Sequence, residues 1–123
     1  MTRRDERALL WDLITHGKRA IAFMDARSLD QYLEDRLVRS AVEREVAIIG
    51  EAYGALDQLR ADLVNRLPGD VRAVVGMRNV LVHGYAQVED SRIHSIVADE
   101  LPPLVSSAEE LLFELGGEAP SRP

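Results

Sequence analysis

The chain has 123 residues, of which 46% are hydrophobic and 5% aromatic, with no cysteine and a formal net charge of −6. These values predict one domain with an aliphatic, helical core, and they exclude disulfides and thiolate metal sites. No apolar run approaches the roughly 18 residues of a membrane span, and no apolar segment follows the charged start, so we expect a cytoplasmic protein without a membrane partner.

The first predicted helix runs from about Arg4 to Met24. Its apolar positions form one broad face that should pack in the core: Ala8, Trp11, Leu13, Ile14, Ile21 and Phe23. Gly17 is expected to weaken this helix midway. His16 and His94 have no partner at a metal-ligand spacing, and we expect both at the surface or at the flank of a helix.

A second helix should begin near Leu29, because Ser28 is followed three residues later by Gln31 in the pattern of a capping box. Apolar residues then recur at steps of three and four well beyond Leu29, which predicts one long core helix. Glu45 is the one polar member of its apolar stripe, which comprises Val38, Ala41, Val42, Glu45, Val46, Ile49, Ala52, Tyr53 and Leu56.

Residues 67–70, Leu-Pro-Gly-Asp, predict a turn before a short third helix that Gly84 ends. Residues 89–91 can cap a last helix, which Pro102-Pro103 must kink or divide and Gly116-Gly117 should end. These boundaries predict a single helical domain over residues 1–115 and a flexible tail over residues 116–123.

Residues 78–85, RNVLVHGY, contain the side chains best suited to catalysis: Arg78, Asn79, His83 and Tyr85. A histidine can move the proton of a ribose 2'-hydroxyl, and an arginine can hold the charge that develops on phosphorus. The acidic balance of the chain argues against a nucleic-acid partner. However, residues 60–83 are locally basic, with four arginines against two aspartates.

Helical geometry decides how this segment could act. Five helical steps of about 100° place Arg78 and His83 roughly 140° apart, so they would not converge on a regular helix. If Gly84 ends the helix, His83 lies at a C-terminus, where the helix dipole would raise its pKa and suit a general acid. One chain then offers one histidine, whereas a two-fold dimer would supply both an acid and a base.

The order Arg, polar residue, three further residues, His, one residue, Tyr in 78–85 resembles the signature of HEPN domains, specifically the HepT-type toxins of MNT/HepT toxin-antitoxin pairs. Residues 48–52, IIGEA, resemble an element of the family's long helix. Residues 99–104, DELPPL, resemble its DLPxL segment, with one residue more between the acid and the leucine. The resemblance extends roughly from Leu9 to Leu115.

The resemblance implies an all-α, HEPN-like up-and-down bundle of four to five helices that forms a homodimer with a shared cleft. The implied activity is that of a metal-independent endoribonuclease without a cofactor, with messenger or transfer RNA as substrate. Arg78 and His83 would be catalytic, and Asn79 would support them. Tyr85 falls on the tyrosine that an MNT-type nucleotidyltransferase antitoxin modifies with AMP.

A second interpretation is a non-catalytic HEPN module that binds a nucleotide or scaffolds a nucleotidyltransferase. The acidic balance favours this module, whereas the intact Arg78, Asn79 and His83 favour the enzyme. In the simplest case Arg78 is a surface residue, His83 caps a helix and Tyr85 packs on a neighbouring helix. Glu51 is either an ordinary polar position or part of a dimer cleft. The sequence has no HxH or HExxH spacing, which argues against a metal site.

Overall fold

The computed structural model describes residues 5–69, 76 and 90–117, and these residues contain helices and turns but no strand. This confirms the all-α prediction for the described part of the chain. The elements in chain order are α1 (Glu6–Met24), α2 (Leu29–Glu34), α3 (Arg36–Leu59), α4 (Ala61–Val64), α6 (Asp90–Ser95), the π-helical segment η1 (Ile96–Glu100) and α7 (Leu101–Glu114). None of the described helices is long and apolar enough to cross a membrane.

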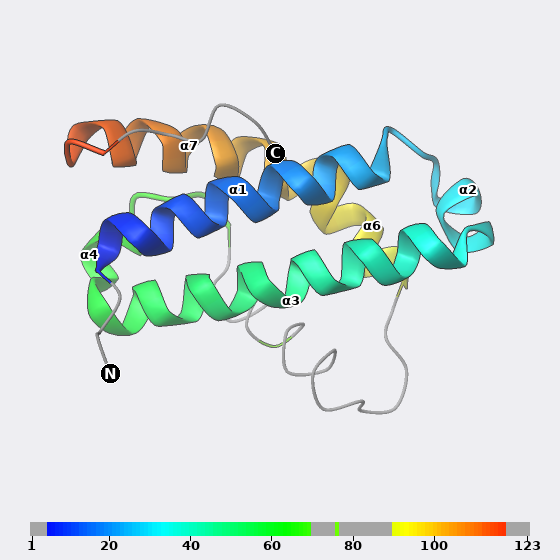
Figure 1. Ribbon diagram of the computed structural model, residues 1–123, viewed down its shortest axis with the longest axis horizontal. Helices are drawn as coiled ribbons and strands as arrows, with labels where there is room; N and C mark the ends of the chain where they lie inside the picture. The colour runs from blue at the N-terminus through cyan, green and yellow to red at the C-terminus, as the bar shows by residue number, and fades with distance from the viewer. Residues whose placement is uncertain (1–4, 70–75, 77–89, 118–123) are drawn as a thin grey trace.

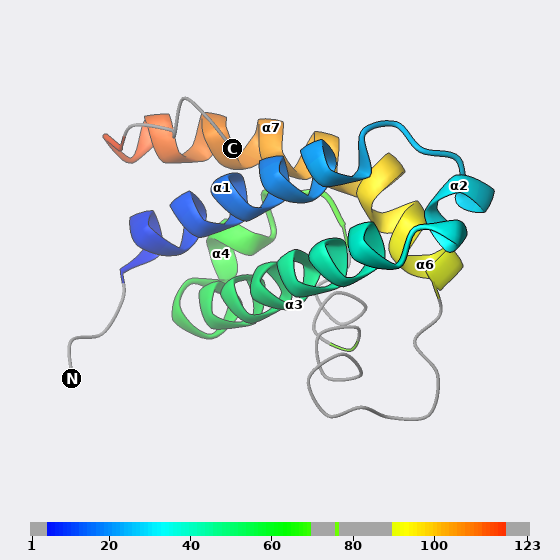
Figure 2. The same cartoon turned by 45° about the vertical axis from the view of Figure 1, so that its right-hand side comes forward.

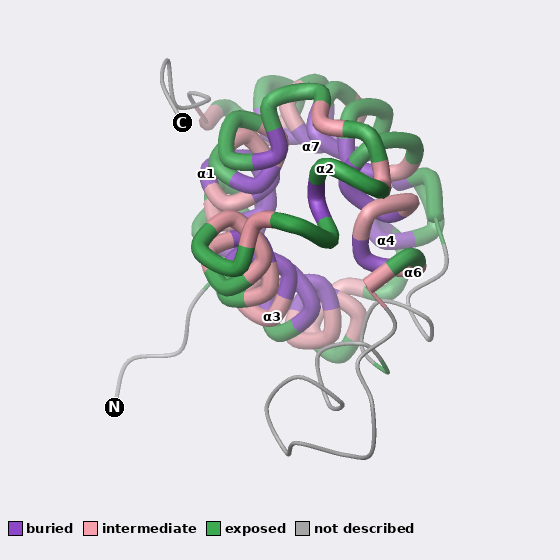
Figure 3. Tube along the Cα trace, turned by 90° about the vertical axis from the view of Figure 1, so that its right-hand side faces the viewer, coloured by how far each residue is buried: buried purple, intermediate pink, exposed green. Residues whose placement is uncertain are grey.

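The long helices run up and down beside one another. Figure 1 shows α1 between α3 and α7, and it runs antiparallel to both. Viewed along the bundle, the buried sides of the helices face a common interior (Figure 3). Leucine, isoleucine and valine dominate this interior, as the composition predicts. The architecture therefore agrees with the predicted helical bundle, while the predicted homodimer remains a prediction.

The buried face of α1 differs from the predicted one. The buried positions include Leu9, Leu10, Leu13, Ile14, Ala20 and Met24. Trp11 and Phe23 are 43% and 41% exposed, so their assignment to the core is wrong. The helix packs on two neighbours at once, and the aliphatic positions between those neighbours form the core in place of the aromatic residues.

Gly17 does not interrupt α1, which continues through it. It is buried, and a Cβ atom built on it would lie 2.5 Å from Cγ2 of Val105 on α7. No side chain fits at that distance unless the Val105 side chain or one of the two helices moves. Gly17 therefore lets the backbones of α1 and α7 approach each other closely, which outweighs the intrinsic helix penalty of glycine.

The predicted capping box is present at the start of α2. The Gln31 backbone N–H donates to Ser28 Oγ at 3.2 Å, and the Ser28 N–H donates to Gln31 Oε1 at 2.9 Å. The prediction of one continuous helix from this point is wrong, because the chain leaves helical geometry at Asp35 (φ −111°, ψ 95°). The Asp35 carboxylate accepts a hydrogen bond from the Val38 N–H and caps α3. A short acidic side chain that binds nearby backbone competes with helix continuation.

The predicted stripe of α3 is confirmed. Six of its apolar members are buried, namely Val42, Val46, Ile49, Ala52, Tyr53 and Leu56, and Glu45 is buried with them. After α3 the chain forms α4, a single helical turn that the sequence pattern did not predict. The predicted turn follows at residues 65–69, where Gly69 adopts a φ of +109°. The predicted third helix lies outside the described residues, except for Gly76.

Prolines divide the last helix, as predicted, and a π-helical segment lies at the division. The backbone widens into η1, where the Leu101 N–H donates to the Ile96 carbonyl, and α7 then starts with prolines in its first turn. Proline is tolerated there because the first turn needs no N–H donor. The predicted stop is also confirmed: Gly116 adopts a φ of +83°, and the Gly117 N–H donates to the Leu112 carbonyl at 2.9 Å.

We expect Gly17→Ala to lower the free energy of unfolding by about 1–3 kcal/mol, because the added methyl group overpacks the contact between α1 and α7. Urea or guanidinium titration followed by circular dichroism measures this change. In a second background, Val105→Ala makes room for the methyl group, so the double variant should lose less stability than the two single changes together. Gly76→Ala is the matched control, because nothing lies within 4 Å of a Cβ at this exposed helical glycine. Equal losses from Gly17→Ala and Gly76→Ala would contradict the close-approach explanation.

Candidate functional site

The residues predicted to carry the chemistry, Arg78, Asn79, His83 and Tyr85, lie outside the described part of the chain. Their predicted roles therefore remain predictions. The structure does describe residues before and after this segment, among them Gly69 at the end of the preceding turn and Asp90 at the start of α6.

Both flanking residues lie beside α3. A side chain added at Gly69 would come 3.9 Å from the hydroxyl of Tyr53, and Asp90 Oδ2 lies 3.5 Å from Arg39 Nη1. Arg39 and Tyr53 are both on α3 and lie 14 positions apart, which corresponds to about 21 Å along a helix axis. The described residues Gly69 and Asp90 thus lie near opposite ends of α3.

His16 has a structural partner that the sequence interpretation missed. Its Nδ1 lies 2.6 Å from Oε2 of Glu45, which joins α1 to α3. Both side chains are largely buried, with 16% and 7% of their surface exposed. A buried carboxylate needs a partner, and Glu45 as the one polar member of an apolar stripe was the signal that could have predicted it.

His94 lies in the last turn of α6 and also has structural partners. Its Nε2 lies 2.7 Å from the Arg27 carbonyl oxygen, and its ring lies 5.9 Å from that of Tyr32. The chain has three histidines, and the two described ones hold helices and loops together. The third histidine, His83, lies outside the described residues.

The exposed face of α3 carries Glu51, which the resemblance singled out. Glu51 is exposed, whereas Ile49 and Ala52 of the same IIGEA run are buried in the core. The run is therefore mainly a packing element with one solvent-facing acid. Its exposure is compatible with both earlier interpretations of Glu51, the ordinary polar position and the dimer cleft.

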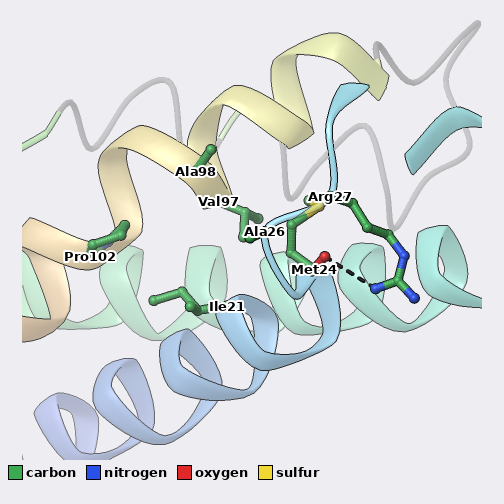
Figure 4. Close-up of a pocket in the computed structure, with 7 residues that line it drawn as sticks. All are labelled: Ile21, Met24, Ala26, Arg27, Val97, Ala98 and Pro102. Atoms are coloured by element: carbon green, nitrogen blue, oxygen red, sulfur yellow. Dashed lines mark hydrogen bonds between the residues drawn. The ribbon is translucent and has the colours of Figure 1, made fainter. Parts of the chain in front are cut away.

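A cavity of about 330 Å³ lies between the C-terminal end of α1 and η1. Figure 4 shows its lining residues, which are Ile21, Met24, Ala26, Arg27, Val97, Ala98 and Pro102. Arg27 is the one charged member, and its Nη1 already donates to the Phe23 and Met24 carbonyls at 3.0 and 3.2 Å. The lining residues include no acid–base or nucleophilic group, so this cavity has no side chain that could transfer a proton.

Strained backbone borders this cavity. Asp25 and Ala26 both adopt left-handed conformations, with φ values of 48° and 55°. Non-glycine residues rarely take this conformation, and two in succession raise the energy of the loop. The hydrogen bonds from Arg27 to the last carbonyls of α1 offset part of that cost.

The comparisons with known proteins agree with the helical architecture. The model of a family described as "Ribonuclease HepT-like" matches residues 13–111. No solved structure matches the chain.

Two relatives from Methanocaldococcus jannaschii match nearly end to end. "Putative RNase MJ0127" is 29% identical over 119 residues, which cover 96% of each chain. "Putative RNase MJ1380" is 27% identical over 109 residues, which cover 89% of this chain and 98% of the relative. The match to the family model includes residues 78–85 and most of the described bundle. The chain therefore belongs to the HepT-like ribonuclease family.

Proposed function

We propose that this protein is the toxin of a toxin-antitoxin pair and acts as a metal-independent endoribonuclease, with Arg78 and His83 as catalytic residues in a cleft shared by two copies of the chain. The observation that carries the proposal is the match to the HepT-like ribonuclease family over residues 13–111, which include 78–85. The structural use of His16 and His94 supports His83 as the proton-transfer group.

The proposed reaction is a transesterification within the RNA backbone. The ribose 2'-oxygen attacks the adjacent phosphorus while one histidine accepts its proton, and the bond from phosphorus to the 5'-oxygen breaks. A second histidine gives that leaving oxygen a proton. The products are a 2',3'-cyclic phosphate and a 5'-hydroxyl. Two copies of His83 in a two-fold dimer would provide both groups, and Arg78 would hold the charge on the non-bridging oxygens.

The charge distribution explains how an acidic chain could still act on RNA. Six arginines of the described chain form ion pairs with acids, namely Arg7, Arg27, Arg39, Arg60, Arg66 and Arg92. Acids therefore neutralise most arginines of the described bundle, while Arg19, Arg36 and Arg44 remain exposed without an ion pair to the described residues. In this proposal Arg78 carries most of the phosphate recognition, and RNA affinity should depend weakly on salt.

We expect Arg78→Ala and His83→Ala each to lower RNA cleavage by at least about 10²-fold, because each removes a group that acts in the transition state. The measurement is the rate of cleavage of a labelled RNA by purified chain, with the oligomeric state of each variant checked by size exclusion. Arg44→Ala is the matched control, since Arg44 is exposed on α3 and forms no ion pair with the described residues. Full activity in either motif variant would remove that residue from the catalytic role.

We further propose that an MNT-type nucleotidyltransferase neutralises the toxin by adding AMP to Tyr85. In this step the Tyr85 oxygen attacks the α-phosphorus of ATP, a bond from oxygen to phosphorus forms, and pyrophosphate leaves. An adenylyl group two residues from His83 adds bulk and a negative phosphate. It would exclude RNA and could occupy Arg78.

Incubation of the chain with such an enzyme and ATP should add one or more AMP masses to the peptide that contains Tyr85 and stop RNA cleavage. Peptide mass spectrometry locates the modification, and Tyr85→Phe should remain unmodified. The chain supplies internal controls, because Tyr32 and Tyr53 are buried in the core with 0% and 1% exposure. AMP on any residue other than Tyr85 would remove that tyrosine from the regulatory role.

The alternative of a non-catalytic module is favoured by the acidic charge and by the ion-paired arginines. Expression of the chain alone in a bacterium discriminates between the two. Growth arrest that His83→Ala relieves supports the toxin. Normal growth under verified expression of the native chain favours the module.

A further inference from the structure

The cavity beside η1 has two unusual backbone segments in its wall. Figure 2 shows the end of α1, α2 and α6 at the same end of the bundle. Ala26, in the loop between α1 and α2, lines the cavity and adopts a left-handed conformation. Val97 and Ala98 line it from the π-helical segment η1. Both features are frequent at functional sites, so this cavity is a candidate binding site.

The backbone carbonyl of Ala98 has no hydrogen-bond donor in its own helix. Its α-helical donor would be the N–H of residue 102 and its π-helical donor that of residue 103, and both of these residues are prolines. The N–H of Leu101, which is the remaining neighbour, donates to the Ile96 carbonyl instead. A backbone carbonyl without a protein donor needs one from water or from a ligand.

This carbonyl lies on the side of the helix that borders the cavity. Ala98 and Pro102 are four positions apart, and both residues line the cavity. A helical carbonyl points along the axis toward the residue four positions later, so the Ala98 carbonyl points toward Pro102. Figure 4 shows these two residues on one wall of the cavity, with Ile21 of α1 across from them. The wall therefore presents an acceptor among apolar side chains.

The other lining side chains are apolar, except for Arg27. The Arg27 guanidinium donates to the carbonyls of Phe23 and Met24, and its Nη2 lies 3.8 Å from Asp35 Oδ2, so its charge is engaged at the end of α1. A hydrogen bond of 2.7 Å between His94 Nε2 and the Arg27 carbonyl ties the loop after α1 to α6. The cavity is thus held open by its surroundings and favours an uncharged molecule.

We propose that this cavity binds a small, uncharged and mainly apolar molecule with one hydrogen-bond donor, and that this donor binds the Ala98 carbonyl. A compact aromatic ring with an N–H group meets these requirements, because its faces can pack on aliphatic walls and on the Met24 thioether. The cavity volume of about 330 Å³ lies within the range of small-molecule sites. This site uses none of residues 78–85 and does not depend on the proposed ribonuclease reaction.

The test titrates the purified chain with indole and with benzofuran, which has nearly the same shape but an oxygen in place of the N–H. Methyl chemical shifts in NMR spectra report both the affinity and the place of binding. We expect indole to bind about 3-fold to 10-fold more tightly, which is the effect of one hydrogen bond, with the largest shifts at Ala26, Val97 and Ala98. Equal affinities, shifts centred elsewhere, or no binding up to the solubility of indole would overturn the proposal.

Pro102→Ala and Pro103→Ala form a matched pair of variants, because both prolines are exposed in the first turn of α7. Pro102→Ala supplies an N–H at the α-helical spacing from the Ala98 carbonyl, so indole should lose its advantage while benzofuran binds as before. Pro103→Ala supplies an N–H toward the Asp99 carbonyl and should leave the advantage of indole unchanged. The same ratio of the two affinities in both variants would contradict the role of the Ala98 carbonyl.

Ala98→Leu tests whether the cavity itself is the binding site. Ala98 is exposed, so the fold should accept the larger side chain, which would occupy the space of the ligand and abolish indole binding. Ala22→Leu is the matched control, because Ala22 is exposed on α1 and does not line the cavity. If circular dichroism shows that Ala98→Leu does not fold, Ile21→Phe fills the cavity from the α1 wall and provides the same comparison. Native affinity for indole in a folded, filled variant would overturn the proposal.

Discussion

The packing of α1 against both α3 and α7 is the constraint on which the other features depend. This helix packs against its two neighbours through a wide aliphatic face, and Gly17 permits its close contact with α7. The His16–Glu45 contact adds an oriented polar link between α1 and α3 inside this apolar surface. Such a link discriminates against other registers of the two helices, because a shift would leave a buried carboxylate unpaired.

This framework places α3 beside described residues that precede and follow the predicted catalytic segment, residues 78–85. Gly69 lies beside Tyr53 and Asp90 lies beside Arg39, so described residues before and after residues 78–85 both lie against this helix. A catalytic segment on a rigid support can keep a precise geometry, as proton transfer requires. The apolar cavity beside η1 is lined by no acid–base group, so it does not compete with residues 78–85 as the place of the proposed chemistry.

Local signals in the sequence predicted the helices, the capping box at Ser28, the proline division and the Gly116-Gly117 stop, because each depends on a few neighbouring residues. The break at Asp35 was missed, since the apolar period continues across it and only the Asp35 side chain interrupts the helix. Trp11 was misplaced because periodicity alone does not tell how many neighbours a helix has. The partners of His16 and Arg39 lie 29 and 51 positions away and depend on tertiary packing, which no local pattern contains.

The measurement that most directly tests the central claim is the identity of the RNA ends produced by purified, unmodified chain in the presence of EDTA. Metal-independent transesterification predicts fragments with a 2',3'-cyclic phosphate and a 5'-hydroxyl, formed at the same rate with and without the chelator. Mass spectrometry of the fragments identifies these ends. Loss of cleavage on chelation, or fragments that carry a 5'-phosphate, would contradict the mechanism based on Arg78 and His83.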